Sequence, residues 1–308
     1  MRISFFNSLF ELAKQDKSIV IATADMGFNL LERFRDELPS QYVNCGIAEA
    51  NTVTMSAGMA LLGKKVFAYS IVPFMTFRCF EQTRVDVCYQ DADVKLIGVG
   101  GGLDYAQSGT SHHSIEDISV MRSLPNMSVV CPGDPLEAAA LPEILVKMGR
   151  PAYVRLGRGK EPVVHKQKPP MAVGKGIGVF NASAKADIVV FSTGNMLHNA
   201  LQAVEALHSH GLKIKLFSMP WIKPIDAPLI ISEAKGCGLV VTVEEHIKTG
   251  GLRSAVIEVL SEERINTPVN SISLPDAFQK VTGSQEYLRK LNGLDVDSII
   301  KTIQSTEK

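Results

Sequence analysis

Apolar runs of strand length alternate with helical patterns along the first half of the chain. The strand-like runs are continuously apolar rather than alternating between apolar and polar residues, so both faces of each strand should be covered. This favours a parallel β-sheet with helices on both sides. The predicted strands are 19–25, 65–72, 94–100, 127–132 and 152–157, and the predicted helices are 3–15, 49–62, 75–90, 114–123 and 135–148.

The pattern restarts after residues 160–173, where three prolines indicate a linker. A chain of 308 residues is about the right length for two domains. We therefore predict two consecutive parallel-sheet α/β domains, residues 1–165 and residues 166–308. The second contains predicted strands at 187–194, 213–220, 238–245 and 270–275 and predicted helices at 195–210, 226–235 and 251–263, with two short helices after them.

Composition narrows the class of protein. Hydrophobic residues make up 45% of the chain and charged residues 21%, the balance of a soluble globular protein. The net charge of zero argues against a nucleic-acid or acidic-membrane partner, and no apolar run approaches the roughly 18 residues of a membrane span. Five cysteines are scattered singly without metal-ligand spacing, which predicts a reduced, cytoplasmic protein.

The most informative segment for chemistry is YVNCGIAEANTVTMSAGMALLG (42–63). A short strand ends at Gly46, and Glu49 begins a helix whose later residues are apolar or small. Glu49 is the only charged residue between Glu37 and Lys64, so its carboxyl should be poorly solvated. These residues alone leave two interpretations open: an acid that favours the helix dipole, or a functional carboxyl held away from water.

Two other segments contain unusual residue patterns. In AYSIVPFMTFRCFEQTR (68–84), three phenylalanines recur three residues apart, a spacing typical of a core stripe on a helix. Residues 100–138 begin with a glycine-rich loop that lacks both common phosphate-loop patterns. That segment continues with Ser-His-His-Ser-Ile-Glu-Asp and then Met-Arg-Ser-Leu-Pro-Asn.

Together, Gly-Ile-Ala-Glu after a strand, the His-His segment and the Arg-Ser-Leu-Pro-Asn run resemble transketolases and 1-deoxyxylulose-5-phosphate synthases. The resemblance covers nearly the whole chain in the right order, but only half of a full-length transketolase. It implies a pyrimidine-binding domain over 1–165 and a transketolase C-terminal domain over 166–308. The implied cofactor is thiamine diphosphate, and the implied reaction is transfer of a two-carbon ketol unit.

The resemblance assigns cofactor contacts to several residues. Glu49 is implied to be catalytic and to hydrogen-bond the aminopyrimidine ring, and acid–base help of this kind contributes roughly 10²–10⁴-fold. Phe74 is the best candidate for stacking on that ring, and Phe77 is the next. Ile71 stands where transketolases often carry another aromatic residue, and Asp25 aligns with an acidic residue near the cofactor.

Substrate contacts follow from the same resemblance. His112 aligns with a histidine that contacts substrate and can shuttle a proton near neutral pH, so it is predicted to be catalytic and substrate-binding. His113 stands where transketolases usually carry Gln, and Arg158 aligns with the arginine that grips the substrate phosphate. Ser108 replaces an aspartate that contacts a substrate hydroxyl, and Gly100 replaces a second histidine, which predicts altered sugar specificity.

The second domain contains VTVEEHIKTGGLRSAV (241–256), which resembles the matching strand, loop and helix of transketolases. The resemblance implies an architectural role, so Glu244, Glu245 and His246 are predicted to be structural. Gly250 and Gly251 begin a helix whose N-terminus is a possible anion site by geometry.

One expected motif is missing. Family enzymes hold the diphosphate and its divalent metal with a Gly-Asp-Gly…Asn motif in a separate N-terminal domain, whereas PGDP (132–135) lacks the second glycine. No metal ligand is therefore predicted in this chain, and Mg²⁺ or a similar ion would be bound by a partner. The resemblance implies an N-terminal partner subunit, with a homodimer of this chain inside a heterotetramer that acts on a sugar.

Three alternatives stay open at this point. The chain could be the β subunit of a 2-oxo acid dehydrogenase decarboxylase component, although those usually carry Ser-Glu-Gln at the glutamate motif. It could instead belong to a deoxyxylulose-phosphate-synthase-like enzyme. A non-catalytic binding or regulatory protein with the same fold is the third, and Glu49, Phe74 and His112 argue against it.

Overall fold

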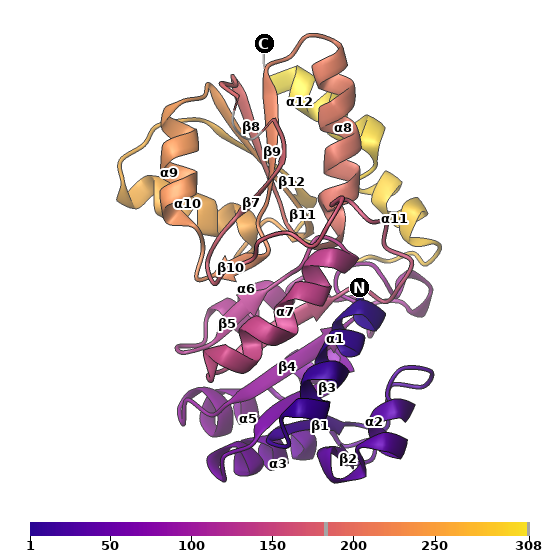
Figure 1. Ribbon diagram of the computed structural model, residues 1–308. Helices are drawn as coiled ribbons and strands as arrows, with labels where there is room; N and C mark the ends of the chain where they lie inside the picture. Colours follow the sequence, from indigo (N-terminus) through magenta and orange to yellow (C-terminus); the bar gives the residue numbers. More distant parts are fainter. Residues whose placement is uncertain (182–183, 307–308) are drawn as a thin grey trace.

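The computed structural model describes residues 1–181 and 184–306, which form two α/β units stacked one above the other (Figure 1). The first unit contains a seven-stranded sheet in the order β10-β5-β6-β4-β3-β1-β2. All its neighbouring strands are parallel except β10, which runs antiparallel to β5. Its strands are β1 (Ile19–Thr23), β2 (Tyr42–Asn44), β3 (Lys65–Ile71), β4 (Val94–Val99), β5 (Ser128–Val130), β6 (Ala152–Leu156) and β10 (Trp221–Lys223).

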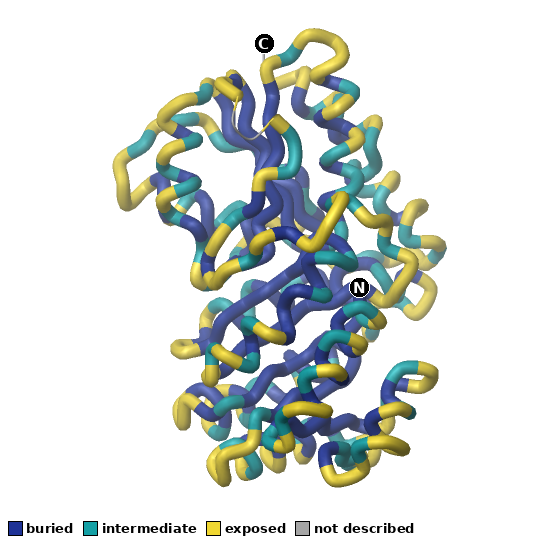
Figure 2. Tube along the Cα trace, viewed as in Figure 1, coloured by how far each residue is buried: buried dark blue, intermediate teal, exposed yellow. Residues whose placement is uncertain are grey.

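Alternate residues of the first sheet's strands enter two different hydrophobic clusters. Phe67 and Tyr69 of β3 pack with α1 (Arg2–Gln15) and α7 (Pro135–Met148). Val66 and Ala68 face the other side, toward α3 (Glu49–Leu61), α4 (Val72–Thr76) and α6 (Asp117–Arg122). The strands are therefore buried on both faces, as their continuous apolar runs predict, and Figure 2 shows them as the dark interior of the unit.

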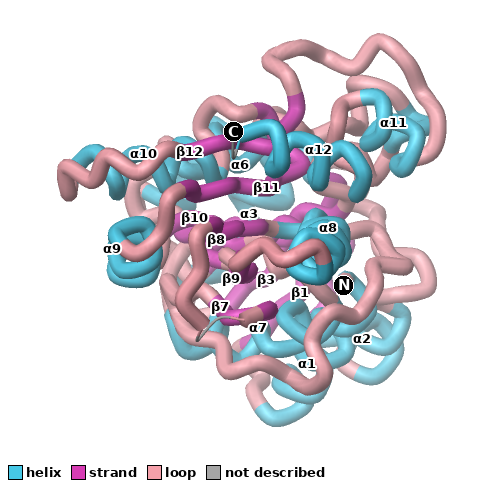
Figure 3. The backbone as a smooth tube through the Cα atoms, turned by 90° about the horizontal axis from the view of Figure 1, so that it is seen from above, coloured by secondary structure: helices cyan, strands magenta, loops and turns pink. Residues whose placement is uncertain are grey.

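The second unit is built around a five-stranded sheet in the order β12-β11-β8-β9-β7. Helices α8 (Leu197–Ser209) and α12 (Val296–Thr306) cover one face, and α9 (Ala227–Lys235) and α10 (Leu252–Glu262) cover the other. Figure 3 shows this layering from above. The strands are β7 (Ile177–Phe180), β8 (Ile188–Ser192), β9 (Ile214–Ser218), β11 (Leu239–Ile247) and β12 (Val269–Leu274).

The predicted α/β fold class is confirmed, and the structure differs from the predicted details at three places. Edge strands β7 and β10 are antiparallel to their neighbours, although only parallel strands were expected. The helix expected over 75–90 is divided into α4, α5 (Phe80–Gln82) and a π-helical turn at Thr83–Cys88. Strand β10 comes from the second half of the chain but completes the first sheet, so the two units share a strand.

Arg155 is a buried tie between the units. Its Nε donates to the Asp117 carboxylate at 2.9 Å, and its Nη2 donates to the backbone oxygens of Ser114 and Glu245 at 2.9 and 3.0 Å. All the hydrogen bonds described for this guanidinium are therefore internal, and Arg158 is the arginine in this loop that faces solvent. None of the helices in the described parts of the chain is both long and apolar enough to span a membrane.

Candidate functional site

The residues singled out by the sequence follow the carboxyl ends of neighbouring parallel strands. Asp25 follows β1, Glu49 follows β2, Phe74 follows β3, His112 lies in the loop after β4 and Arg158 follows β6. Carboxyl ends of parallel strands share one edge of the sheet, which is where open α/β sheets bind ligands. The topology therefore collects these side chains at one edge.

Glu49 is the first helical residue of α3 and is 4% exposed. One of its carboxylate oxygens accepts a hydrogen bond of 2.6 Å from Arg78, whose side chain is half exposed. The Arg78 guanidinium also lies 4.5 Å from the centre of the Phe74 ring. A buried carboxylate and an aromatic face thus hold one planar, charged group between them.

The contacts continue from Phe74 to the substrate candidates. The Phe74 ring meets His112 edge-to-face with centroids 5.3 Å apart, and His112 lies 5.7 Å from the ring of Tyr105. The Arg158 guanidinium lies over the Tyr105 ring at 4.8 Å. Glu49, Phe74, His112 and Arg158 therefore belong to one continuous line of contacts, with Arg78 and Tyr105 as the connecting residues.

Sequence reasoning missed both connecting residues. Arg78 follows Phe77 in the aromatic segment, and Tyr105 lies inside the loop that follows the glycines. An arginine beside an aromatic stripe and an aromatic residue in a glycine-rich loop were the available signals. Neither indicates a role until the fold brings Arg78 to Glu49, which is 29 residues earlier in the chain.

The other predicted site residues lie outside this line. His113 is buried, its Nε2 is 3.3 Å from the Ala106 carbonyl oxygen, and burial lowers its pKa. Ser108 is exposed, and its backbone N–H donates to Tyr105. Phe77 is half-buried at the end of α4, and no ring contact of its own occurs within the described residues.

Asp25 is exposed and is joined to Asn44 by two hydrogen bonds. Its carboxylate accepts from the Asn44 amide at 2.9 Å, and its backbone N–H donates to the Asn44 side-chain oxygen at 3.1 Å. This pair lines a separate surface pocket of about 280 Å³. The roles predicted for Asp25, Ser108, His113 and Phe77 stay predictions.

Asp104 supports the backbone of the Arg158 loop. One of its carboxylate oxygens accepts from the Arg158 N–H at 2.9 Å, and the other accepts from Gln285 of α11 (Gln285–Leu291) at 2.8 Å. Burial, with the negative charge of Glu245 nearby, raises the pKa of Asp104 to about 7. The loop that carries Arg158 is therefore braced against the second unit.

The possible anion site at the start of α10 is filled by the chain itself. The Glu244 carboxylate accepts from the N–H groups of Leu252 and Arg253 at 2.7 and 2.9 Å. Burial raises the pKa of Glu244 to about 7. The glycine pair at 250–251 thus lets a neighbouring strand's own carboxylate reach the helix N-terminus, which agrees with the structural role expected for Glu244.

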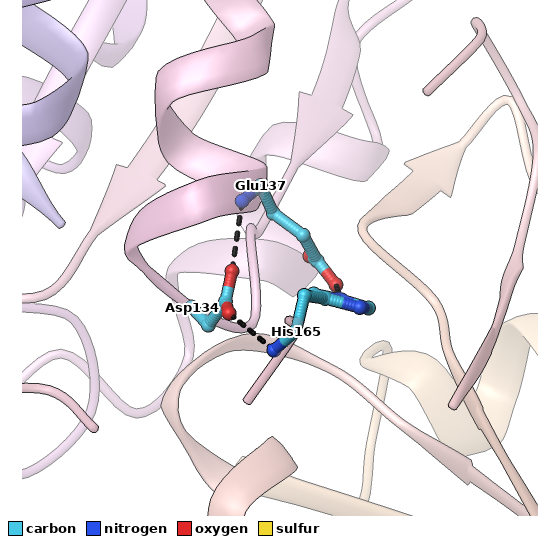
Figure 4. Close-up of side chains that lie close together, drawn as sticks. All are labelled: Asp134, Glu137 and His165. Carbon is cyan, nitrogen blue, oxygen red and sulfur yellow. Dashed lines mark hydrogen bonds and ion pairs between the residues drawn. The ribbon is translucent and has the colours of Figure 1, made fainter. Parts of the chain in front are cut away.

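Asp134, Glu137 and His165 form a compact acidic cluster with one histidine (Figure 4). Asp134 is the N-cap of α7, and its oxygens already accept from four backbone N–H groups, at Leu136, Glu137, Val164 and His165. Glu137 accepts from the Gly133 N–H and contacts His165 Nε2 at 2.8 Å. Because these oxygens are already used, we interpret the cluster as a clasp that fastens the linker to α7.

The clasp predicts a pH-dependent contribution to stability. Burial disfavours the charge on His165, but the hydrogen bond and charge of Glu137 outweigh burial and raise the pKa of His165 above 6.5. The stabilisation is therefore fully present below pH 6.5 and is lost as pH rises through the raised pKa. We expect His165→Ala to lower the free energy of unfolding by about 1.5–3 kcal/mol at pH 6 and by less at pH 8.

Urea unfolding of both proteins at the two pH values measures this difference. His210→Ala is the control, because that exposed ring contacts a backbone carbonyl rather than a carboxylate. A His165→Ala penalty that is the same at pH 6 and pH 8 would contradict the assignment.

Comparison with known proteins gives consistent matches over the whole chain. Residues 1–162 match the family model of the transketolase pyrimidine binding domain, and residues 180–299 match that of the transketolase C-terminal domain. One of the two kinds of subunit of the apulose-4-phosphate transketolase from Phocaeicola vulgatus is 39% identical over 303 residues, which cover 98% of this chain and 95% of that protein.

Two further matches have the same length relationship. The 6-deoxy-6-sulfo-D-fructose transketolase subunit SqwH of Clostridium sp. strain MSTE9 is 32% identical and covers 98% of this chain and 92% of that protein. A solved structure described as a split gene transketolase, inactive beta4 tetramer, superposes with a TM-score of 0.87 at 32% identity, over 98% of this chain and 96% of the other.

Proposed function

This chain belongs to the transketolase family, and on that premise we propose that it is the subunit of a split transketolase that supplies the pyrimidine half of a shared thiamine-diphosphate site. The assembled enzyme would transfer a two-carbon ketol unit between sugars. The observation that carries the proposal is the pairing of buried Glu49 with the aromatic face of Phe74 around one planar group.

The position of Arg78 supports the fit of the cofactor's ring. Its flat guanidinium donates a hydrogen bond to Glu49 while it lies over the Phe74 ring. An aminopyrimidine ring needs the same two contacts, one to a carboxyl and one to an aromatic face. Because the Arg78 side chain is half exposed, it can move aside. Glu49 and Phe74 would then hold the ring between them.

Each residue of the line has a defined task in this proposal. Thiamine diphosphate, when bound, supplies the nucleophilic carbon of the reaction. Glu49 holds a proton at the ring nitrogen, which a carboxyl shielded from water can do without competition from solvent. His112 is half-buried beside Phe74, and it donates or accepts a proton at a sugar hydroxyl. Arg158, exposed beyond Tyr105, binds an anionic group of the sugar.

The names of the relatives support an anionic substrate. One acts on apulose 4-phosphate and another on 6-deoxy-6-sulfo-D-fructose, so their sugars carry a phosphate or a sulfonate. Arginine suits both groups, because its planar guanidinium can donate two parallel hydrogen bonds to a tetrahedral oxyanion. We propose that the sugar bound by this chain also carries a terminal oxyanion.

We further propose a partner subunit with the diphosphate-binding domain and a divalent ion such as Mg²⁺, in a heterotetramer built on a homodimer of this chain. The related structure described as an inactive beta4 tetramer supports both the self-association and the need for a partner. The five cysteines are all unpaired, which supports a reducing, cytoplasmic location.

The test is reconstitution with such a partner, followed by a screen of donor sugars. Ketol transfer from at least one ketose in the presence of thiamine diphosphate and Mg²⁺ is expected. A reconstituted complex that binds the cofactor but decarboxylates 2-oxo acids instead would overturn the proposal.

Arg158→Ala gives a prediction about the substrate. Loss of the guanidinium should raise the KM for phosphorylated sugars about tenfold to a hundredfold, because a hydrogen bond to a charged group contributes about 1.5–3 kcal/mol. The KM of an unphosphorylated sugar should change little. Steady-state kinetics on matched sugar pairs measures both, with exposed Arg150→Ala as the control. An equal change for the two sugars would show that Arg158 has another role.

A further inference from the structure

Tyr105 lies where a side chain at position 100 would have to be. Gly100 has a positive φ of +84°, and a Cβ built on it would lie 2.1 and 2.3 Å from two ring carbons of Tyr105. Real Cβ atoms do not approach other atoms so closely, so the ring packs directly against the backbone of the glycine. The missing side chain at position 100 and the placement of Tyr105 are two aspects of one arrangement.

The Tyr105 ring contacts two site residues. His112 lies 5.7 Å away between ring centroids, and the Arg158 guanidinium lies 4.8 Å from the ring centre. The ring is itself half-buried and packs at the margin of the core under α1 and α7. A rigid aromatic ring anchored in the core thus separates the histidine from the arginine.

The residue before Tyr105 controls the same arginine from its backbone. Asp104 accepts a hydrogen bond from the Arg158 N–H at 2.9 Å and is tied to Gln285 of the second unit. Adjacent residues of one loop therefore hold both the main chain and the guanidinium of Arg158. The position of the arginine relative to His112 depends on this loop.

We propose that Tyr105 is a specificity-determining positioning residue, which sets the separation between the hydroxyl contact at His112 and the oxyanion contact at Arg158. This inference rests on the proposed function. The ring selects sugars whose terminal oxyanion lies at a matching distance from the hydroxyl that His112 contacts. Tyr105 acts through its two neighbours, so it should affect KM for oxyanionic sugars rather than turnover in general.

The test uses three substitutions in the reconstituted complex. Tyr105→Phe keeps the aromatic face, Tyr105→Leu keeps bulk without that face, and Tyr105→Ala removes both. We expect the Leu and Ala variants to raise KM for a phosphorylated sugar about fivefold or more, because a cation over an aromatic ring is a favourable contact. Their kcat should stay within about twofold, their KM for the unphosphorylated analogue should be unchanged, and Tyr105→Phe should behave as wild type.

A double-mutant cycle with Gly100→Ala tests the packing. In the wild-type background the new Cβ collides with the ring, so KM for the phosphorylated sugar should rise as it does in Tyr105→Ala. In the Tyr105→Ala background the same substitution should add little. Thermal melts confirm that each variant is folded. Sulfated and phosphorylated forms of one sugar show whether the oxyanion can be of either kind.

The outcomes are distinguishable. A wild-type complex that transfers no ketol unit overturns the proposed function, and this inference with it. An active wild type combined with a Tyr105→Ala variant of normal KM overturns only the inference. Equal losses for phosphorylated and unphosphorylated sugars, or a Tyr105→Phe variant as impaired as Tyr105→Ala, also overturn it.

Discussion

Replacing Glu49 by Gln lowers the ketol-transfer turnover of the assembled enzyme at least about tenfold, while the chain stays folded. The amide keeps the shape of the side chain but cannot hold and release a proton at the cofactor's ring nitrogen. Glu49 is 4% exposed, so water cannot readily take over this task. Folding should persist because the Arg78 partner is half exposed and can be solvated when the pair is lost.

Single-turnover kinetics with saturating cofactor separates this effect from weaker binding. Glu81→Gln is the matched control, because Glu81 is an exposed carboxyl on α5, in the segment that carries Arg78. Circular dichroism and thermal melting check that both variants are folded. Turnover of Glu49→Gln within twofold of wild type would remove Glu49 from the catalytic residues.

Much of the fold follows from local signals in the sequence. The helix expected over 135–148 forms at those residues, because Asp134 caps its first turn, Pro135 suits the first helical position, and Gly149 ends it in the left-handed conformation. Strand β4 was expected because its run is apolar for its whole length apart from Lys95, and all six of its residues are buried. Such elements carry their own start and stop signals.

The missed elements depend on distant partners. Strand β10 has three residues between Pro220 and Pro224, too short a run to predict a strand, and its partner β5 lies about 90 residues earlier. Its pairing stabilises it only after both units have formed. The site shows the same division. Motifs pointed to Glu49, Phe74 and His112, whereas the contacts of Arg78 and Tyr105 depend on the packing of separate loops.

The isolated chain is expected to fold and self-associate, yet to stay inactive until a partner subunit joins it. Folding is expected because both units bury complete cores on two faces of a sheet. Self-association is expected because α3 and the π-helical turn expose large apolar side chains, including Leu62 at 86% and Tyr89 at 80%. Exposed apolar groups of this kind mark interfaces, and twofold symmetry is the commonest arrangement.

Inactivity is expected because this chain holds only one end of the cofactor. Stacking on Phe74 and one hydrogen bond to Glu49 leave the diphosphate and its metal without the motif that binds them in the family. The ring must also displace Arg78, which already makes both contacts. Ring stacking contributes only about 0.5–1.5 kcal/mol beyond area burial, too little to hold a charged, hydrated molecule. Affinity should therefore be at best millimolar, corresponding to about 4 kcal/mol.

Titration calorimetry with thiamine diphosphate and Mg²⁺ measures this, first on the chain alone and then with the partner. We expect no resolvable heat from the chain alone and at least about a hundredfold tighter binding after mixing, accompanied by ketol transfer. Phe74→Ala is the companion variant, since it should weaken binding in the mixture without changing the behaviour of the isolated chain. Micromolar binding and ketol transfer by the chain alone would overturn the split-site proposal, because the diphosphate would then have a site within these 308 residues.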